Sequence, residues 1–230
     1  MFGNQFRLWM ALGRSVRLWD VQRGLLLRSW NRDTINFSIK MIQIDQKRPD
    51  RLWCFGSDET GMMMFTILNA MTGKLEIPWR AVEASSGNNS TRIIIESTID
   101  TIVTARKQEH QDDWIIKGYT RGAVSLDGAF EFSLSNDLNC TEKSVKSLSI
   151  HPDRSDLLAL LFENARDILI VKVSKDHWAP SCLLIDTARE VDAVHWGPCE
   201  DDPITGEKGC KIVTIEKESK VIRLYTLSKI

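Results

Sequence analysis

The sequence repeats one pattern along its length: a short apolar run, a turn, and a second apolar run. The second runs of four such pairs superimpose on one another, at residues 15–21, 62–68, 167–173 and 221–227. The intervening turns, such as SDETG and NARD, are polar or contain glycine, which is typical of β-hairpins. Because a repeat constrains every element at once, it limits the fold more than any single motif does.

Further runs extend these hairpins into units of four strands. Three hairpins are preceded by runs at 34–44, 145–152 and 191–198, and three are followed by runs at 25–30, 74–79 and 181–187. A weaker copy is predicted with strands at 99–105, 113–119, 122–126 and 130–134. Most runs are shorter than about eight residues and rich in Ile, Val, Phe and Trp, which favours strands over helices. The best helical candidate is a short turn near 187–192.

The spacing of the copies supports a regular repeat. Trp19, Thr66, Val171 and Tyr225 occupy equivalent positions, at intervals of 47, 105 and 54 residues. With two units in the interval of 105, this matches a repeat of about 40 to 45 residues with loop insertions. The predicted insertions are the polar segments 81–92 and 199–209.

Units of four strands at this period resemble the WD-repeat β-propellers. The first unit has Leu-Trp-Asp at the end of its third strand, and the second has GSDETG at the turn between its second and third strands. These motifs supply the predicted structural signature: Leu18, Trp19, Asp20, Gly56, Ser57, Asp58 and Gly61. Segment 148–161 is similar to the family's first two strands, in a style closest to the C-terminal propeller of fungal NACHT-type signalling receptors.

The sequence also departs from the family pattern. Thr66 and Ile67 stand where the second unit would have Trp-Asp, and no unit opens with Gly-His. No unit can supply the family's complete Asp, His, Ser and Trp hydrogen-bond network, so we expect the blades to depend on apolar packing. The tryptophans expected to pack between blades are Trp9, Trp19, Trp53, Trp114 and Trp196.

The predicted fold is therefore all-β: a single WD-like propeller domain or propeller fragment of four-stranded antiparallel blades over residues 1–230. Its five approximate units are 1–33, 34–80, 81–138, 139–187 and 188–230. The first unit begins at its second strand and the last ends after its third, so we expect the propeller to be incomplete at both ends, with exposed sheet edges and apolar faces. The alternatives are another propeller type or an open β-sandwich.

Composition excludes several classes of protein. The 30 Lys and Arg nearly balance the 31 Asp and Glu, so no global field favours nucleic acid or an anionic membrane. The 5 cysteines never form a CxxC pair, which argues against a disulfide framework and a structural zinc site. No apolar window approaches about 18 residues. We expect a soluble protein without a secretory signal, in the cytoplasm or alternatively the nucleus.

The sequence offers no catalytic or metal-binding pattern. There is no GxSxG or HExxH motif, and no histidine has a second ligand type at metal spacing; the histidines are His110, His151, His177 and His195. Neighbouring carboxylates such as Asp112 and Asp113 would point to opposite faces of a strand. We therefore predict a non-enzymatic chain without cofactor or metal.

The first unit is the most suggestive segment for binding. It has a net charge of +4 over residues 1–33, and its arginines are Arg7, Arg14, Arg17, Arg23, Arg28 and Arg32. They could form a basic face for phosphate or an acidic partner, since Arg suits bidentate recognition. The favoured interpretation is the solvent side of amphipathic strands.

The predicted function is a protein–protein interaction scaffold or ligand-sensing propeller whose loops and top face bind another protein. The expected partner is another protein or further blades of a longer chain. The alternatives are phosphate or nucleic-acid binding through the arginines, and a hydrolase or lyase at the propeller channel.

Overall fold

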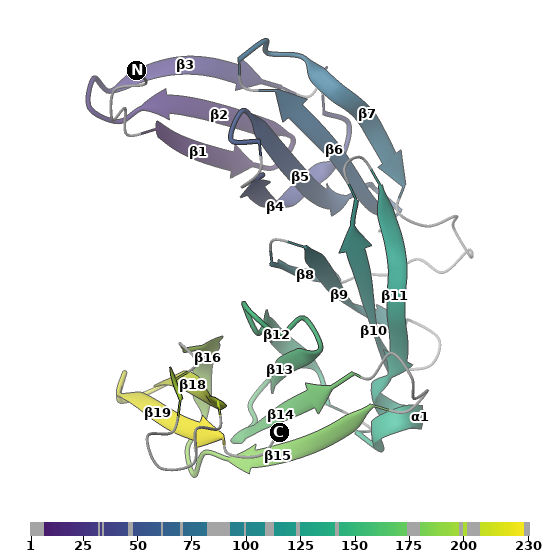
Figure 1. Ribbon diagram of the computed structural model, residues 1–230, viewed down its shortest axis with the longest axis vertical. Helices are drawn as coiled ribbons and strands as arrows, with labels where there is room; N and C mark the ends of the chain where they lie inside the picture. The colour runs from purple at the N-terminus through teal and green to yellow at the C-terminus, as the bar shows by residue number, and fades with distance from the viewer. Residues whose placement is uncertain are drawn as a thin grey trace. The chain divides into compact units, whose positions relative to one another are not determined.

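The strands associate into five antiparallel sheets, shown in Figure 1. The computed structural model describes residues 7–31, 33, 35–45, 48–60, 62–69, 71–81, 93–98, 100–108, 113–122, 125–140, 143–173, 180–197, 200–201 and 208–227. The chain divides into two compact units, Met1–Ile95 and Glu96–Ile230, which are described separately.

The first unit contains two sheets. The three-stranded sheet has the order β1-β2-β3, with β1 (Arg7–Leu12), β2 (Ser15–Asp20) and β3 (Leu25–Trp30). The four-stranded sheet has the order β4-β5-β6-β7, with β4 (Ser38–Ile44), β5 (Arg51–Ser57), β6 (Met63–Asn69) and β7 (Leu75–Ala81). Each strand pairs with its neighbour in sequence, as expected of blades built from hairpins.

The second unit contains most of the other three sheets; β8 crosses the division between the units. One sheet comprises β8 (Ile93–Ser97), β9 (Thr101–Gln108), β10 (Asp113–Arg121) and β11 (Leu126–Ser133), followed by α1 (Leu134–Leu138). The next comprises β12 (Val145–Ile150), β13 (Leu157–Phe162), β14 (Asp167–Lys172) and β15 (Ser181–Asp186). The last comprises β16 (Val191–Trp196), β17 (Glu200–Asp201), β18 (Lys208–Glu216) and β19 (Ile222–Leu227), with β17 and β19 both paired to β18.

In the first unit, one side of the β1–β3 sheet packs against the β4–β7 sheet. Val16, Leu18 and Trp30 are buried there and join a core that includes Leu52. The ring of Trp30 stacks on Trp9 at 5.7 Å between centroids, and its Nε1 donates a hydrogen bond of 3.0 Å to the carbonyl of Gly73. The polar edge of this tryptophan is therefore satisfied across the two sheets.

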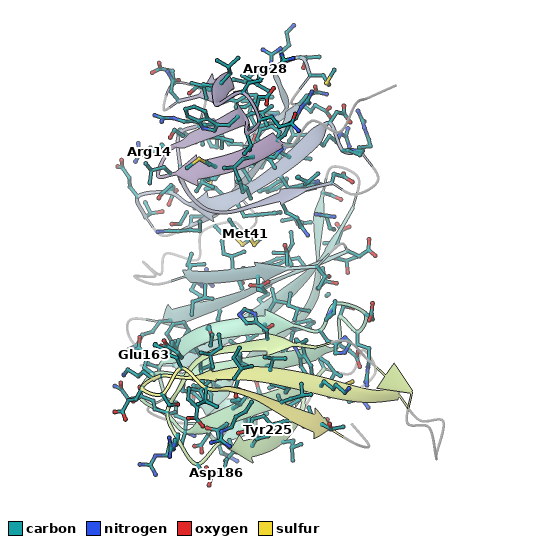
Figure 2. The ribbon with its side chains drawn as sticks, turned by 90° about the vertical axis from the view of Figure 1, so that its left-hand side faces the viewer. Arg14, Arg28, Met41, Glu163, Asp186 and Tyr225 are labelled. Atoms are coloured by element: carbon teal, nitrogen blue, oxygen red, sulfur yellow. The ribbon has the colours of Figure 1, made fainter. Side chains whose placement is uncertain are left out.

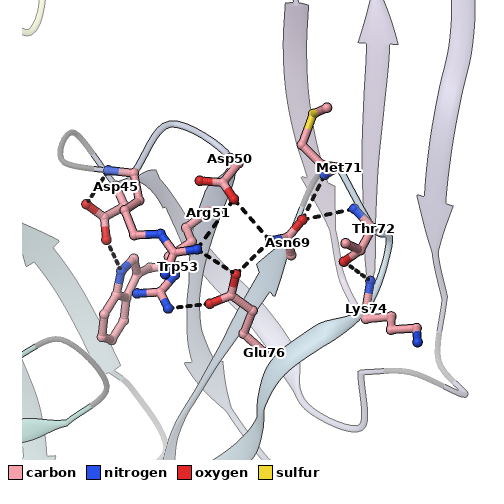
Figure 3. A network of polar contacts seen from close by, with 10 residues as sticks. Asp45, Asp50, Arg51, Trp53, Asn69, Met71, Thr72, Lys74 and Glu76 are labelled. Atoms are coloured by element: carbon pink, nitrogen blue, oxygen red, sulfur yellow. Dashed lines mark hydrogen bonds and ion pairs between the residues drawn. The ribbon is translucent and has the colours of Figure 1, made fainter.

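A polar network braces the turns of the β4–β7 sheet (Figure 3). Asn69 Nδ2 donates to Glu76 at 2.7 Å and to Asp50 at 3.1 Å, and its Oδ1 accepts the backbone N–H groups of Met71 and Thr72. Burial alone would raise the pKa of Glu76, but hydrogen bonds from Asn69 and Arg51 outweigh it and lower that pKa. The network joins the β6–β7 turn to the start of β5.

In the second unit, the apolar positions of β13 are buried on both sides. All six of its residues are buried, because the β12–β15 sheet has another sheet on either face. Leu157, Ala159 and Leu161 share one side of the strand and pack toward Val194 and Ile212 of the last sheet. A continuous apolar run such as this is typical of a strand that meets no solvent.

The structure corrects the strand assignment of the third repeat. Its first strand is β8, so the strand predicted at 99–105 is the second (β9), and the segments 122–126 and 130–134 contribute to one strand, β11. The prediction was wrong because Asp127 and Gly128 have the chemistry of turn residues, whereas they pair with Thr120 and Tyr119 inside the sheet.

Other local predictions had mixed outcomes. The turn near 187–192 is not helical: Ala188 has a positive φ of 60° and β16 begins at Val191. The described helix is α1, where Ser133 Oγ accepts the N–H of Asn136 as an N-cap. The insertion predicted at 199–209 is bounded by a short ribbon, in which Glu200 pairs with Gly209. Residues 82–92 of the other predicted insertion lie outside the described residues.

Candidate functional site

The Leu-Trp-Asp motif divides between two faces of β2. Leu18 is 2% exposed and lies in the core, where it pairs with Trp9 on the neighbouring strand β1. Trp19 lies on the opposite face, beside Leu8. Leu18, and not Trp19, packs against the β4–β7 sheet; Trp19 is half-buried, and its packing between blades stays a prediction. Asp20 is buried and accepts the N–H of Arg23 at 3.1 Å, which closes the β2–β3 turn.

The second motif builds a turn. Gly56 lies where a Cβ would be 1.9 Å from the carbonyl oxygen of Ser38, so no larger residue fits without displacing backbone. Ser57 ends β5, and Asp58 accepts the N–H groups of Thr60 and Met62, both at 2.9 Å. Gly61 lies outside the described residues. These roles are structural, and any binding role stays a prediction.

The arginines of the first repeat do not gather at one place. Figure 2 shows Arg14 and Arg28 apart from one another: Arg14 lies in the β1–β2 turn and Arg28 lies in β3. Arg14 pairs with Glu59 at 2.6 Å, Arg23 lies 3.9 Å from Asp20, and Arg28 donates to the carbonyl of Met71 at 2.9 Å. Arg7 is exposed at the start of β1, Arg17 is exposed within β2, and Arg32 lies outside the described residues. The basic face predicted for phosphate stays untested.

A hollow of about 330 Å³ lies among the turns of the last two sheets. Turns between second and third strands, and connections between successive sheets, emerge at the same end of the blades because antiparallel strands alternate in direction. The hollow is formed by the β13–β14 turn, the β15–β16 connection and the β18–β19 turn, and its charged lining residues are Arg166, Arg189, Glu190, Glu216 and Glu218.

Backbone bonds fix the walls of this hollow. The N–H and hydroxyl of Thr187 both donate to the carbonyl of Arg166, the former at 2.8 Å, which ties the β15–β16 connection to the β13–β14 turn. Asp186 accepts the N–H of Ala188 at 2.8 Å and supports its left-handed backbone. The N–H of Lys217 donates to the carbonyl of Glu190 at 2.9 Å, which ties the same connection to the β18–β19 turn.

Glu216 is the electrostatic anchor of the hollow. Its side chain is 2% exposed and lies 3.5 Å from Nη1 of Arg189. The hydroxyl of Ser219 and Nε of Arg223 also donate to its carboxylate. The hydrogen bond from Ser219, followed by that from Arg223, lowers the pKa of Glu216, so this carboxylate stays ionised and holds both arginines near neutral pH.

Two acidic side chains that follow Arg189 in the chain, Glu190 and Asp192, are also paired. Asp192 accepts from Lys220 at 2.8 Å and from Lys146 at 2.9 Å, and these hydrogen bonds lower its pKa to about 2. Glu190 pairs with Lys217 at 2.6 Å. Arg166 differs: its side chain is exposed at the hollow, and no described residue provides it with a hydrogen bond or ion pair.

Sequence reasoning missed this site. Arg166 belongs to the NARD turn, which the sequence identifies only as hairpin chemistry, and Arg189 and Glu216 are distant in the chain. The repeat offered an indirect signal, because equivalent turns and connections are expected at one end of stacked units. The charges on those turns vary between copies, so the signal does not select this pair of sheets.

The potential metal ligands do not converge in the described part of the chain. The described residues include no group of three His, Cys, Asp or Glu side chains placed to hold a metal, and no helix among them is long and apolar enough to cross a membrane. His195 is exposed in β16, while His110 and His177 lie outside the described residues. His151 is completely buried and accepts two backbone N–H groups through Nδ1.

Comparison with known proteins bears on the fold. No protein-family model and no curated protein matches the sequence. Raptor from Chaetomium thermophilum is 13% identical over 99% of this chain and 20% of its own, with a TM-score of 0.54. A Lactobacillus plantarum protein is 12% identical over 98% and 69%, with a TM-score of 0.54. A chain of the COPII outer coat vertex is 12% identical over 97% and 59%, with a TM-score of 0.52.

At these identities the comparisons establish the fold alone. The five antiparallel sheets described above, of three or four strands each, are consistent with blades of a β-propeller. The prediction of about five antiparallel blades is confirmed: the described residues form five sheets, of which the first has three strands and the other four have four each. The similarity to NACHT-type receptors stays a prediction. The fold of this chain is therefore that of a β-propeller built from antiparallel blades.

Proposed function

We propose that this chain is a non-enzymatic protein-interaction module and that the hollow binds an acidic segment of a partner protein. The observation that carries the proposal is the guanidinium of Arg166 at the hollow, which makes no hydrogen bond or ion pair with any described residue. The neighbouring Arg189 already shares its charge with Glu216 at 3.5 Å. Arg166 is thus the cation that remains available to an incoming carboxylate.

The shape and chemistry of the hollow suit a side chain of a partner. A guanidinium binds a carboxylate through two parallel N–H donors, and this geometry provides direction as well as energy. The volume of about 330 Å³ is at the small end of the range for ligand pockets, about 300 to 1,000 Å³. The walls are held by backbone hydrogen bonds, so little conformational entropy would be lost on binding.

Affinity capture with matched variants tests this proposal. Wild-type protein and the variants Arg166→Glu and Arg80→Glu would each be used to capture proteins from cells that express this chain. Arg80 is the control because it is exposed on β7, in the other unit. We expect one stoichiometric partner with wild type and Arg80→Glu, and at least a tenfold loss with Arg166→Glu, which corresponds to about 1.4 kcal/mol.

Two results would contradict the proposal. Equal recovery by Arg166→Glu and wild type would remove the hollow as the binding site, and repeated recovery of no partner would remove the interaction function. A partner that is a nucleic acid would instead show affinity that falls steeply with salt concentration.

A further inference from the structure

Most charges in and beside the hollow of the second unit are already paired within the protein. Glu216 lies 3.5 Å from Arg189 and also accepts from Arg223, and Glu190 accepts from Lys217 at 2.6 Å. The field of such a pair largely cancels at a distance, so these groups attract an incoming charge less than a single ion would. A ligand of the hollow is therefore selected mainly by the charges that remain.

Two charged residues of the lining make no hydrogen bond or ion pair with any described residue. They are Arg166 in the β13–β14 turn and Glu218 in the β18–β19 turn, and both are exposed. The cation next to Glu218 in the chain, Lys217, is engaged elsewhere: its hydrogen bond to Glu190 is the main cause that raises the pKa of Lys217, and the charge of Glu218 contributes the least. One wall of the hollow thus presents a cation, and another presents an anion.

A neutral polar side chain accompanies this cation. Asn164 belongs to the same turn as Arg166, has a left-handed backbone with φ of 53°, and also lines the hollow. Its side chain makes no hydrogen bond with a described residue. Because an amide both donates and accepts, it can bind the backbone of a peptide beside either charge.

The two walls are held in place by one segment, the β15–β16 connection. The N–H of Thr187 donates to the carbonyl of Arg166 at 2.8 Å, and the N–H of Lys217, next to Glu218, donates to the carbonyl of Glu190 at 2.9 Å. Both bonds join a turn to the same connection, so the backbones of Arg166 and Glu218 keep a fixed separation. Such preorganisation favours a ligand whose own charges have a matching separation.

This arrangement discriminates between two kinds of acidic ligand. A ligand with negative charge alone is attracted by Arg166 but repelled by Glu218, whereas a ligand that also has a positive charge is attracted by both. Exposed charge pairs contribute little individually, so we expect a preference of about threefold rather than an absolute selection.

We propose that the partner segment bound by the hollow is dipolar: an acidic side chain pairs with Arg166, and a basic side chain close to it in the same segment pairs with Glu218. The second pairing depends on the function proposed above, because the hollow must first be a binding site. It specifies the chemistry of the partner more narrowly, since an acidic segment without a nearby base would leave Glu218 unpaired beside it.

Short capped peptides of equal length are suitable probes. Dipolar peptides would contain one Asp and one Lys at several spacings. In the matched acidic peptides, acetyl-lysine replaces Lys, which removes the charge. Nuclear magnetic resonance would measure their dissociation constants for the full chain from the amide shifts of Ala188 and Ser219, which line the hollow. At the best spacing, we expect the dissociation constant of the dipolar peptide to be about threefold lower than that of its acidic match.

Variants of Glu218 identify the acceptor of the basic side chain. Glu218→Gln keeps the size of the side chain and should abolish the preference, whereas Glu218→Lys should reverse it, so that the acidic peptide binds more tightly. The matched controls are Glu131→Gln and Glu131→Lys, because Glu131 is an exposed glutamate on β11, whose sheet contributes none of the lining residues. These controls should keep the wild-type preference. Circular dichroism would establish that each variant is folded.

The contrary results separate this proposal from the function on which it depends. Equal binding of dipolar and acidic peptides to wild type, or tighter binding of both by Glu218→Gln, would contradict a dipolar segment but agree with an acidic one. A preference that persists in Glu218→Gln would assign the basic side chain to another acceptor. Equal binding by wild type and Arg166→Glu, or no peptide-induced shift at Ala188 and Ser219, would remove the hollow as a binding site and overturn both proposals.

Discussion

The protonation of one buried side chain, His151, makes the stability of this fold depend on pH. It is completely buried after β12, and its Nδ1 accepts the N–H groups of Asp153 and Arg154, both at 3.1 Å. Its ring lies 4.9 Å from that of Trp196 on the last sheet. Burial is the main cause that lowers the pKa of His151 below its usual value. The neutral ring is therefore the form that the fold stabilises.

This property predicts how stability changes with pH. The folded-state pKa is below the unfolded value of about 6.5, so the unfolded state binds the extra proton first. The contribution of the neutral His151 ring to the free energy of unfolding should be complete above about pH 6.5. This contribution should fall as the pH decreases toward the folded-state pKa. Urea unfolding at a series of pH values would measure this. In His151→Asn, which keeps an acceptor but does not titrate, the decrease below about pH 6.5 should be smaller. An unchanged decrease would assign it to other groups.

Gly56 leads to a second prediction at the same scale. A Cβ at this position would lie 1.9 Å from the Ser38 carbonyl oxygen, so Gly56→Ala should destabilise the protein by about 3 kcal/mol through displaced backbone. Gly128 is the matched control, since a Cβ there meets nothing within 4 Å, and Gly128→Ala should change stability by less than about 0.5 kcal/mol. Chemical denaturation of both variants would measure the difference. Equal effects would contradict the steric explanation.

At the scale of elements, the end of β11 and the start of α1 form one hydrogen-bonded junction. Ser133 Oγ donates to Asp113 at 2.5 Å and accepts the N–H of Asn136 at 2.9 Å, while the N–H of Ser133 donates to Asp137 at 2.6 Å. Asp113 is 3% exposed and begins β10. A helix of five residues has little stability of its own, so this cap is needed to hold it against the sheet.

Removing the cap hydroxyl should therefore be costly. Ser133→Ala would leave the buried carboxylate of Asp113 without one donor and the helix without its N-cap acceptor, with an expected loss of about 1 to 2 kcal/mol. Ser125→Ala is the control, because the exposed Ser125 hydroxyl makes a long contact of 3.5 Å with Asp127. Thermal and urea unfolding would compare them. If the two variants lose the same stability, the junction does not support α1.

At the scale of the whole molecule, apolar exposure is concentrated in the first and last sheets of the chain. The last sheet and its β18–β19 turn add Val221, Ile222 and Leu224 to the exposed residues of the β1–β3 sheet. Ten of the 15 exposed large hydrophobic residues in the described part of the chain lie in these two places. A blade that is covered on both sides hides its apolar residues, whereas a terminal blade of a repeat leaves one side uncovered.

This distribution predicts the solubility of the isolated chain. Replacing Leu8, Met10 and Leu12 together by Ser should reduce aggregation on heating, because these side chains are large, apolar and exposed on one strand. The midpoint of unfolding should change little, since exposed side chains contribute little to the core. Light scattering and circular dichroism in the same temperature scan would separate the two effects. Unchanged aggregation would show that another surface causes it.

The strands, the turns and the period of the repeat follow from the amino-acid sequence alone. Alternating apolar residues and glycine or aspartate turns act over a few residues, so local chemistry decides them. The hairpins predicted around Trp19, Thr66, Val171 and Tyr225 are present for this reason. The first two strands predicted for the third repeat are the second and third strands of its sheet. Its last strand, β11, was predicted as two strands because Asp127 and Gly128 have turn chemistry but lie inside it.

Which face of each strand is covered, and which charges meet, depends on tertiary packing. Sequence alternation shows that Leu18 and Trp19 point to opposite sides, but packing against the β4–β7 sheet makes Leu18 the core residue. The hollow joins three turns from residue 164 to residue 219, and Arg166 and Arg17 lack a partner among the described residues because of where the other charges lie. Such contacts bring together residues far apart in the chain, so no local pattern encodes them.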